Sequence, residues 1–192
     1  QMLQERGFTK EIIESFRLGY APNEKSFIST PLINKGDYNQ AVELGLTKVK
    51  DGASYDMFRD RLIFPIDNES GVVIGFGGRK SNEESAEKYA KYLNSNESKI
   101  YRKERVLYGL HQAKKAIVDS KKAILVEGYT DVITLHQGGI ENVVASSGTS
   151  LTKEQIRLIK RYTPNIKIIY DGDPAGVKAA LRGLDLILES DM

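Results

Sequence analysis

The chain contains 192 residues, of which 40% are hydrophobic and 28% charged, and its formal net charge is +2. A chain of this length can bury a substantial core in one large domain or two small ones. It has no cysteine, which excludes disulfides and a cysteine-based zinc site within these residues. No apolar run approaches membrane-spanning length, and the N-terminal residues do not resemble a signal peptide. We therefore expect an internal fragment of a cytoplasmic protein with no membrane partner.

The N-terminal part is expected to form two short helices that help to build a small subdomain. Residues 9–18 carry an apolar stripe behind Thr9, which suits the N-cap position, and Gly19 ends the segment. Residues 38–46 are the second candidate helix and end in a similar way at a glycine. Neither segment carries residues that point to chemistry.

A β-hairpin is predicted next, because two apolar runs flank a polar link that ends in glycine. The runs are residues 58–66 and 72–79, and the link is residues 67–71. Gly75 and Gly77 resemble the start of a dinucleotide fingerprint, but Lys80 occupies the position of its third glycine. We expect instead that these glycines let the backbone pass close to another group.

Basic residues in and after this hairpin suggest a polyanion. Arginine binds phosphate with two hydrogen bonds and keeps its charge, so we expect the arginines of the hairpin to face phosphates. The polar segment 81–116 interleaves tyrosines with lysines and arginines, which suits a path for single-stranded nucleic acid. Tyrosines that anchor irregular loops to the core would give the same pattern, so both interpretations remain open. The residues concerned are Arg59, Arg61 and Arg79, then Tyr89, Tyr92, Tyr101 and Tyr108 among Lys88, Lys91, Lys99, Arg102, Lys103 and Arg105.

The C-terminal part alternates between buried strands and helices. Strands are predicted at residues 123–126, 141–145 and 166–170, and helices at residues 130–136, 152–162 and 174–189. The first and third strands consist almost entirely of apolar residues, which is typical of strands buried on both faces. The order strand, helix, strand, helix, strand, helix predicts a parallel sheet with flanking helices.

Carboxylates follow two of these strands. Glu127 ends the first, and Asp171 and Asp173 follow the third; each strand stops on an acidic residue followed by glycine. Ligands bind at the carboxyl edge of such sheets, and several carboxylates gathered there need a positive partner. Mg²⁺ takes carboxylate oxygens together with substrate phosphates. The alternative is structural, since Asp173 before Pro174 is a standard helix start.

Residues 127–131 (EGYTD) and 171–176 (DGDPAG) resemble the two acidic motifs of a Toprim domain, which occurs in bacterial primases, type IA and type II topoisomerases and some repair proteins. Further segments resemble the RNA polymerase core of the bacterial DnaG-type primase, in the same order along the chain. They are residues 59–66 (RDRLIFPI), 75–79 (GFGGR), 91–95 (KYLNS), 107–110 (LYGL) and 145–150 (ASSGTS). The resemblance implies an α/β fold: a Toprim-like parallel sheet with flanking helices in residues 121–192, preceded by a smaller α+β subdomain with a β-hairpin in residues 1–120.

The resemblance also implies the site. The matching metal ligands are Glu127, Asp171 and Asp173, with Asp131 beside them as a further catalytic residue. The matching residues for nucleic acid and nucleotides are Arg59, Arg61, Arg79, Lys91, Asn94 and Lys103. It places the active cleft between the two subdomains.

The implied activity is synthesis of short RNA primers on a single-stranded DNA template from ribonucleoside triphosphates during replication. The implied cofactor is Mg²⁺ or Mn²⁺, bound as two ions. The chain stops before a further acidic loop of the family and lacks its zinc-binding domain, so zinc is not expected here. It also lacks the C-terminal domain that binds the replicative helicase at the replication fork in the nucleoid. We therefore expect a truncated core with weak or no activity of its own, in which the missing loop also puts metal binding in doubt.

Two alternatives remain. The chain could belong to another Toprim enzyme, a nuclease or topoisomerase, although no tyrosine lies in a motif assignable to strand passage. It could also be a non-catalytic nucleic-acid-binding module whose acidic residues only stabilise the fold.

Overall fold

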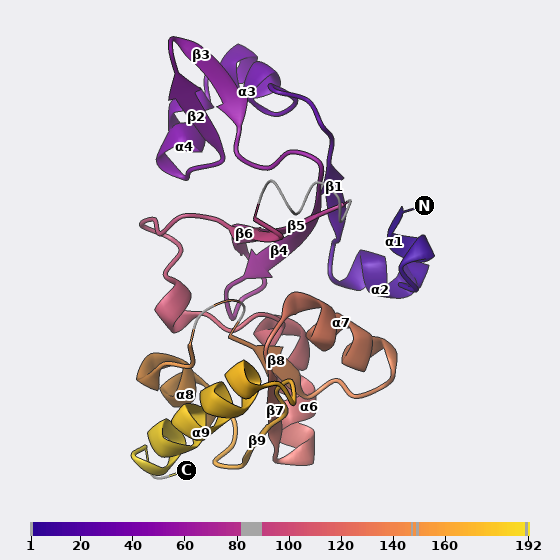
Figure 1. Ribbon diagram of the computed structural model, residues 1–192, viewed down its shortest axis with the longest axis vertical. Helices are drawn as coiled ribbons and strands as arrows, with labels where there is room; N and C mark the ends of the chain where they lie inside the picture. Colours follow the sequence, from indigo (N-terminus) through magenta and orange to yellow (C-terminus); the bar gives the residue numbers. More distant parts are fainter. Residues whose placement is uncertain (1, 82–89, 147, 149, 191) are drawn as a thin grey trace. The chain divides into compact units, whose positions relative to one another are not determined.

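The computed structural model describes residues 2–81, 90–146, 148, 150–190 and 192 (Figure 1). Its helices are α1 (Met2–Glu5), α2 (Lys10–Ser15), α3 (Ser29–Lys35), α4 (Tyr38–Glu43), α6 (Leu110–Ser120), α7 (Tyr129–Gln137), α8 (Lys153–Lys160) and α9 (Pro174–Leu188), with a 3₁₀ turn, η1 (Lys103–Arg105). Its strands are β1 (Gly19–Ala21), β2 (Thr47–Lys50), β3 (Ala53–Asp56), β4 (Arg61–Asp67), β5 (Val73–Lys80), β6 (Tyr92–Asn94), β7 (Ala123–Val126), β8 (Val143–Ala145) and β9 (Ile166–Ile168). No helix in the described part is long and apolar enough to cross a membrane.

The chain forms two compact units that interleave along the sequence. The antiparallel-sheet unit consists of Arg17–Ile66 and Ile74–Tyr101, and the parallel-sheet unit of Gln1–Phe16, Asp67–Val73 and Arg102–Met192. The turn of the β4–β5 hairpin therefore belongs to the parallel-sheet unit. The division at residue 120 into two functional parts stays a prediction.

The antiparallel-sheet unit contains most of the two strands of the predicted hairpin, β4 and β5. Its four-stranded sheet has the order β1-β4-β5-β6, and a separate two-stranded sheet joins β2 and β3. The buried hydrophobic side chains of β4 are Leu62, Phe64 and Ile66, at alternate positions of the strand. The short elements α3, β1, β2, β3 and β6 were not predicted from the sequence.

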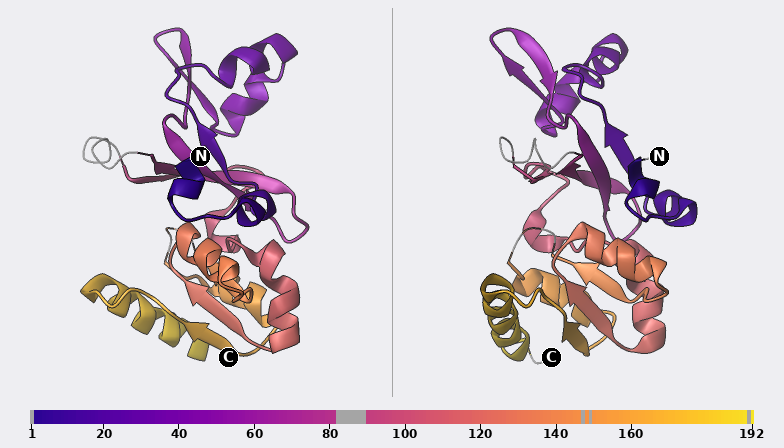
Figure 2. Two further views of the ribbon diagram at one scale, coloured as in Figure 1. Left: turned by 90° about the vertical axis from the view of Figure 1, so that its right-hand side faces the viewer. Right: turned by 45° about the vertical axis from the view of Figure 1, so that its right-hand side comes forward.

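The parallel-sheet unit confirms the predicted alternation of strands and helices. The sheet order is β8-β7-β9, and β7 pairs in parallel with both neighbours. In Figure 2 (right), its strands lie between α9 on one side and α6 and α7 on the other. Helix α6, which the sequence analysis missed, contributes Ala113 and Ile117 to the core, and both are fully buried.

Strand β7 is buried on both faces, as predicted, but β9 is not. Ala123, Leu125 and Val126 are at most 2% exposed. In β9, Ile166 and Ile168 are only half-buried and Lys167 is exposed. Among the described residues β9 pairs with β7 alone, and an edge strand covers less of its surface.

The helix ends follow the predicted capping chemistry. The hydroxyl of Thr9 accepts the N–H of Ile12 at 3.3 Å and caps α2. Thr152 and Gln155 form a reciprocal capping box at the start of α8, where each side chain accepts the other residue's N–H. The side chain of Gln155 is fully buried and also donates to the carbonyl oxygens of Lys103 and Val106, so α8 is tied to the segment around η1.

Candidate functional site

The carboxyl ends of β7 and β9 bring two acidic residues together. Leu125 pairs with Ile168, and the N–H of Ile169 donates to the carbonyl of Leu125 at 2.9 Å. Beyond these pairs, the N–H of Asp171 donates to Oε1 of Glu127 at 3.0 Å. Because parallel strands end at the same edge, residues far apart in the sequence meet there.

Gly176 makes this contact possible, and the sequence analysis gave it no role. A Cβ atom at this position would lie 2.2 Å from the carbonyl oxygen of Asp171 and 2.9 Å from Oε1 of Glu127. The backbone of α9 therefore approaches both residues as closely as only glycine allows. The signal in the sequence was a glycine in the first turn of a helix, which costs about 1 kcal/mol relative to alanine.

Asp131 also lies at this edge. Its Oδ2 accepts the N–H of Gly128 at 2.9 Å, which closes the first turn of α7. Burial raises the pKa of the Asp131 carboxyl, the negative charge of Asp171 raises it further, and the Gly128 hydrogen bond opposes both effects. The carboxylates of Asp131 and Asp171 thus repel each other.

Asp173 caps α9, as the structural alternative predicted. Its Oδ1 accepts the N–H of Gly176 at 2.7 Å, and Pro174 follows at the first helical position. Among the described residues, no three side chains of the His, Cys, Asp and Glu types lie close enough together to hold one metal ion. The predicted ligands Glu127, Asp171 and Asp173 therefore do not form such a group in the described part of the structure, where Asp173 is oriented by its cap on α9 and Asp131 by its bond to Gly128. Their catalytic and metal-binding roles stay predictions.

The pair formed by Glu127 and Asp171 nevertheless suits a divalent cation. Both supply hard oxygen ligands, and Mg²⁺ is usually held by one or two carboxylates plus substrate phosphates. A cation there would also relieve the repulsion between Asp131 and Asp171. Divalent metal use, which the Toprim-like fold generally implies, thus fits the residues present.

In the antiparallel-sheet unit, predicted nucleic-acid residues gather on β5 and β6. Arg79 pairs with Tyr92 across the two strands, and its guanidinium carbon lies 5.9 Å from the centroid of the Tyr92 ring. Asn94 pairs with Gly77, two positions further along the same two strands. The side chain of Lys91, just before β6, is exposed, and Arg59 is partly exposed. Arg79, Lys91, Asn94 and Tyr92 thus provide cations, an amide and an aromatic ring on or next to β5 and β6, whereas Arg59 precedes β4.

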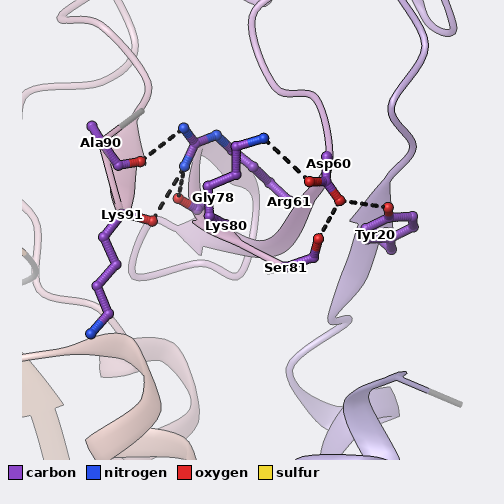
Figure 3. A network of polar contacts seen from close by, with 8 residues as sticks. All are labelled: Tyr20, Asp60, Arg61, Gly78, Lys80, Ser81, Ala90 and Lys91. Carbon is purple, nitrogen blue, oxygen red and sulfur yellow. Dashed lines mark hydrogen bonds and ion pairs between the residues drawn. The ribbon is translucent and has the colours of Figure 1, made fainter. Parts of the chain in front are cut away.

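Arg61 does not meet the expectation that it faces a polyanion. The residue is only 6% exposed, and its guanidinium donates to the carbonyl oxygens of Gly78, Ala90 and Lys91 (Figure 3). The chain before it turns at Asp60, whose φ is +50°, so Arg59 and Arg61 do not follow the alternation of a regular strand. A close approach was predicted for Gly75, where a Cβ atom would lie 3.2 Å from the Tyr101 ring. A tighter one, which was not predicted, occurs at Gly78, where a Cβ atom would lie 2.7 Å from the Phe58 ring and 3.0 Å from the side chain of Arg61.

The remaining residues predicted to contact nucleic acid or nucleotides differ in location and in exposure. Lys103 lies in η1, in the parallel-sheet unit. Tyr101 and Tyr108 are each 3% exposed and anchor their segments to the core, whereas Tyr92 is 38% exposed. Lys88, Tyr89, Ser147 and Thr149 lie outside the described residues.

Comparison with known proteins agrees with this geometry. Residues 1–114 match the family model described as DNA primase catalytic core, N-terminal domain, and residues 124–192 match one described as Toprim-like. The chain is 45% identical over 188 residues to a DNA primase of Halalkalibacterium halodurans, covering 96% of this chain and 31% of the relative. It is 45% identical over 187 residues to a DNA primase of Clostridium acetobutylicum, covering 97% and 30%. The chain thus spans about a third of the length of these relatives.

Solved structures of primases are also similar to this chain. The crystal structure of the zinc-binding and RNA polymerase domains of Aquifex aeolicus primase matches with a TM-score of 0.91 at 37% identity, over 98% of this chain and 46% of that one. A DnaG primase catalytic domain bound to single-stranded DNA matches with a TM-score of 0.88 at 40% identity, over 98% and 58%. The fold and its acidic edge define a Toprim-like α/β protein. The chain belongs to the DNA primase family, which confirms the resemblance seen in the sequence.

Proposed function

We propose that this chain forms part of the catalytic core of a DNA primase, which synthesises RNA primers on single-stranded DNA. The observation that carries the proposal is the contact between Glu127 and the backbone of Asp171 at the carboxyl edge of a Toprim-like sheet. The family match supports it, and so does the related catalytic domain bound to single-stranded DNA.

In the reaction, the 3′-hydroxyl of one ribonucleotide attacks the α-phosphate of the next, and pyrophosphate leaves. Glu127, Asp171 and Asp173 would together hold two Mg²⁺ or Mn²⁺ ions. When bound, such ions would activate the attacking oxygen and neutralise charge on the leaving group. Asp131 keeps the start of α7 in place through Gly128 and adds negative charge next to Asp171. Most of the catalysis in such transfers is positioning and electrostatics.

The basic residues would bind the template and the incoming triphosphate. Arg79, Lys91 and Lys103 supply positive charge, Asn94 supplies an amide, and Tyr92 offers an exposed ring on which a base can stack. In this proposal residues 1–120 are the template-binding part and residues 121–192 the catalytic part. The complete protein would act in the cytoplasm at the replication fork, together with the replicative helicase.

The test is an Asp171→Asn substitution in the full-length protein. Ribonucleotide incorporation on a single-stranded template should fall by more than about 100-fold, beyond the effect of losing a group that only orients a metal ligand. Binding of the template should hold or tighten, because a negative charge is removed. If the variant still makes primers, the metal assignment is wrong and the non-catalytic alternative gains support.

A further inference from the structure

The guanidinium of Arg61 is occupied by the protein's own backbone. Nη1 donates to the carbonyl oxygens of Gly78 at 3.2 Å and Lys91 at 3.3 Å, and Nη2 donates to that of Ala90 at 2.9 Å (Figure 3). The residue is 6% exposed. A guanidinium in this state has little surface left with which to meet a phosphate.

The groups around Arg61 stabilise its buried charge and do not expose it to solvent or to a ligand. Burial lowers the pKa of the Arg61 guanidinium, and the negative charge of Asp60 opposes that shift. A buried charge is costly unless hydrogen bonds satisfy it, and the three carbonyl oxygens do so here. Gly78 leaves room for the stem of Arg61, since a Cβ atom there would lie 3.0 Å from its Cδ.

A second set of contacts fixes the residue before it. The carboxylate of Asp60 accepts the hydroxyl of Tyr20 at 2.9 Å and the ammonium of Lys80 at 3.3 Å, and it also accepts the hydroxyl of Ser81 (Figure 3). These contacts join β1, β5 and the turn before β4. Asp60 thus holds the left-handed turn that directs Arg61 into the sheet.

The segment that Arg61 holds is the start of β6. The carbonyl oxygen of Lys91 receives Nη1 of Arg61 and also the N–H of Lys80 at 2.9 Å, so two strands fix it. The side chain of Lys91 is exposed, and Tyr92 and Asn94 follow in β6. The buried guanidinium therefore helps to fix the backbone of Lys91 at the point where β6, with Tyr92 and Asn94, begins.

We infer that Arg61 is a positioning residue that orients Lys91 and β6 toward the template, and that it does not itself bind phosphate. The inference rests on the proposed function, in which Lys91 binds the template. It makes Lys91 the phosphate contact and Arg61 the residue that places it. Substituting Arg61 should then remove the phosphate contact of Lys91 without removing a phosphate contact of its own.

The salt dependence of single-stranded DNA binding reports the number of phosphate contacts, so it can test whether Arg61 itself binds phosphate. For single strands, each contact contributes about 0.7 to the slope of log K against log salt concentration. In the full-length protein, with a fluorescent oligothymidine as probe, Lys91→Ala should reduce the slope by about 0.7. Arg61→Lys and Arg61→Gln should cause the same reduction, and each should add nothing to Lys91→Ala.

Arg61→Lys is the informative variant, because lysine keeps the charge but lacks the planar fork that reaches three carbonyls. If Arg61 binds phosphate, Arg61→Lys should keep the wild-type slope. The double variant Arg61→Gln/Lys91→Ala should then reduce the slope by about 1.4, because two phosphate contacts are lost. That result would overturn the inference. Arg79→Gln is the matched control, since an independent phosphate contact should add to Lys91→Ala. If Lys91→Ala leaves the slope unchanged, the proposed template surface fails instead.

A second measurement avoids variants that fail to fold. Phenylglyoxal modifies accessible arginines, and mass spectrometry locates the modified sites in the wild-type protein. Arg61 should stay unmodified with and without the oligonucleotide, while Arg79 should react and be protected by it. Modification of Arg61 that the oligonucleotide blocks would contradict the positioning role.

Discussion

Oε1 of Glu127 accepts the N–H of Asp171 at 3.0 Å, which joins two residues that are 44 positions apart in the chain. The contact fixes the end of the central strand β7 against the loop after β9. It also places one carboxylate beside the backbone that presents the other.

Replacing Gly176 with alanine should destabilise the parallel-sheet unit. The new methyl group would lie 2.2 Å from the carbonyl oxygen of Asp171, so backbone must move. Overpacking of this kind costs about 1–3 kcal/mol, which thermal or urea unfolding can measure. The matched control is Gly172→Ala, because a Cβ atom there has nothing within 4 Å, and its free energy of unfolding should stay close to that of the wild type. Equal effects of the two substitutions would contradict the close approach at Gly176.

Replacing Glu127 with glutamine should separate folding from chemistry. The amide oxygen can still accept the N–H of Asp171, so the free energy of unfolding should change by less than about 1 kcal/mol. The charge is lost, and primer synthesis by the full-length protein should fall by more than about 100-fold. Isothermal titration with Mn²⁺ should show weaker binding. Wild-type primer synthesis in this variant would remove Glu127 from the proposed metal site.

Asp173 can be tested for its two roles with two substitutions. Asparagine caps a helix about as well as aspartate, so Asp173→Asn should keep the bond to the N–H of Gly176 and the stability of α9. Asp173→Ala loses the cap and should cost about 1 kcal/mol. If Asp173 also holds metal, both variants should lose primer synthesis although only one is destabilised. Full activity of Asp173→Asn would leave capping as its role.

The stability of the parallel-sheet unit should fall as the pH is lowered below the ordinary histidine pKa of about 6.5, because of His136. Burial lowers the pKa of its imidazole, while its contact with the carbonyl of Val143 and the charge of Glu141 oppose the shift. Its ring packs edge-on against Phe16 at 5.1 Å between centroids. A folded pKa below the unfolded value of about 6.5 means that the unfolded state binds the proton first, so this stabilisation is complete above that value and is lost as the pH falls toward the folded pKa.

Thermal unfolding across this pH range should therefore show a decrease in Tm that His136→Gln reduces. The same substitution at His111 is the control and should keep the decrease, because His136 is still present in that variant. A decrease of the same size in all three proteins would assign the pH dependence to other groups.

The sequence was sufficient for the features that local chemistry controls. The apolar run of residues 123–126 predicted a buried strand, and β7 is one. Capping residues predicted the starts of α2, α8 and α9. The segments that were missed, such as β1 and β6, have three residues each and are formed by pairing with neighbours that are distant in sequence.

For the candidate site, the sequence by itself placed Glu127 and Asp171 at one edge of the sheet, because each follows a strand of one parallel sheet and such strands share a carboxyl edge. Only the tertiary structure decided that Gly176 must leave room for them and that Arg61 turns into the sheet. Both depend on how closely backbones and side chains from separate segments approach each other. Residue types and their spacing carry no such distances.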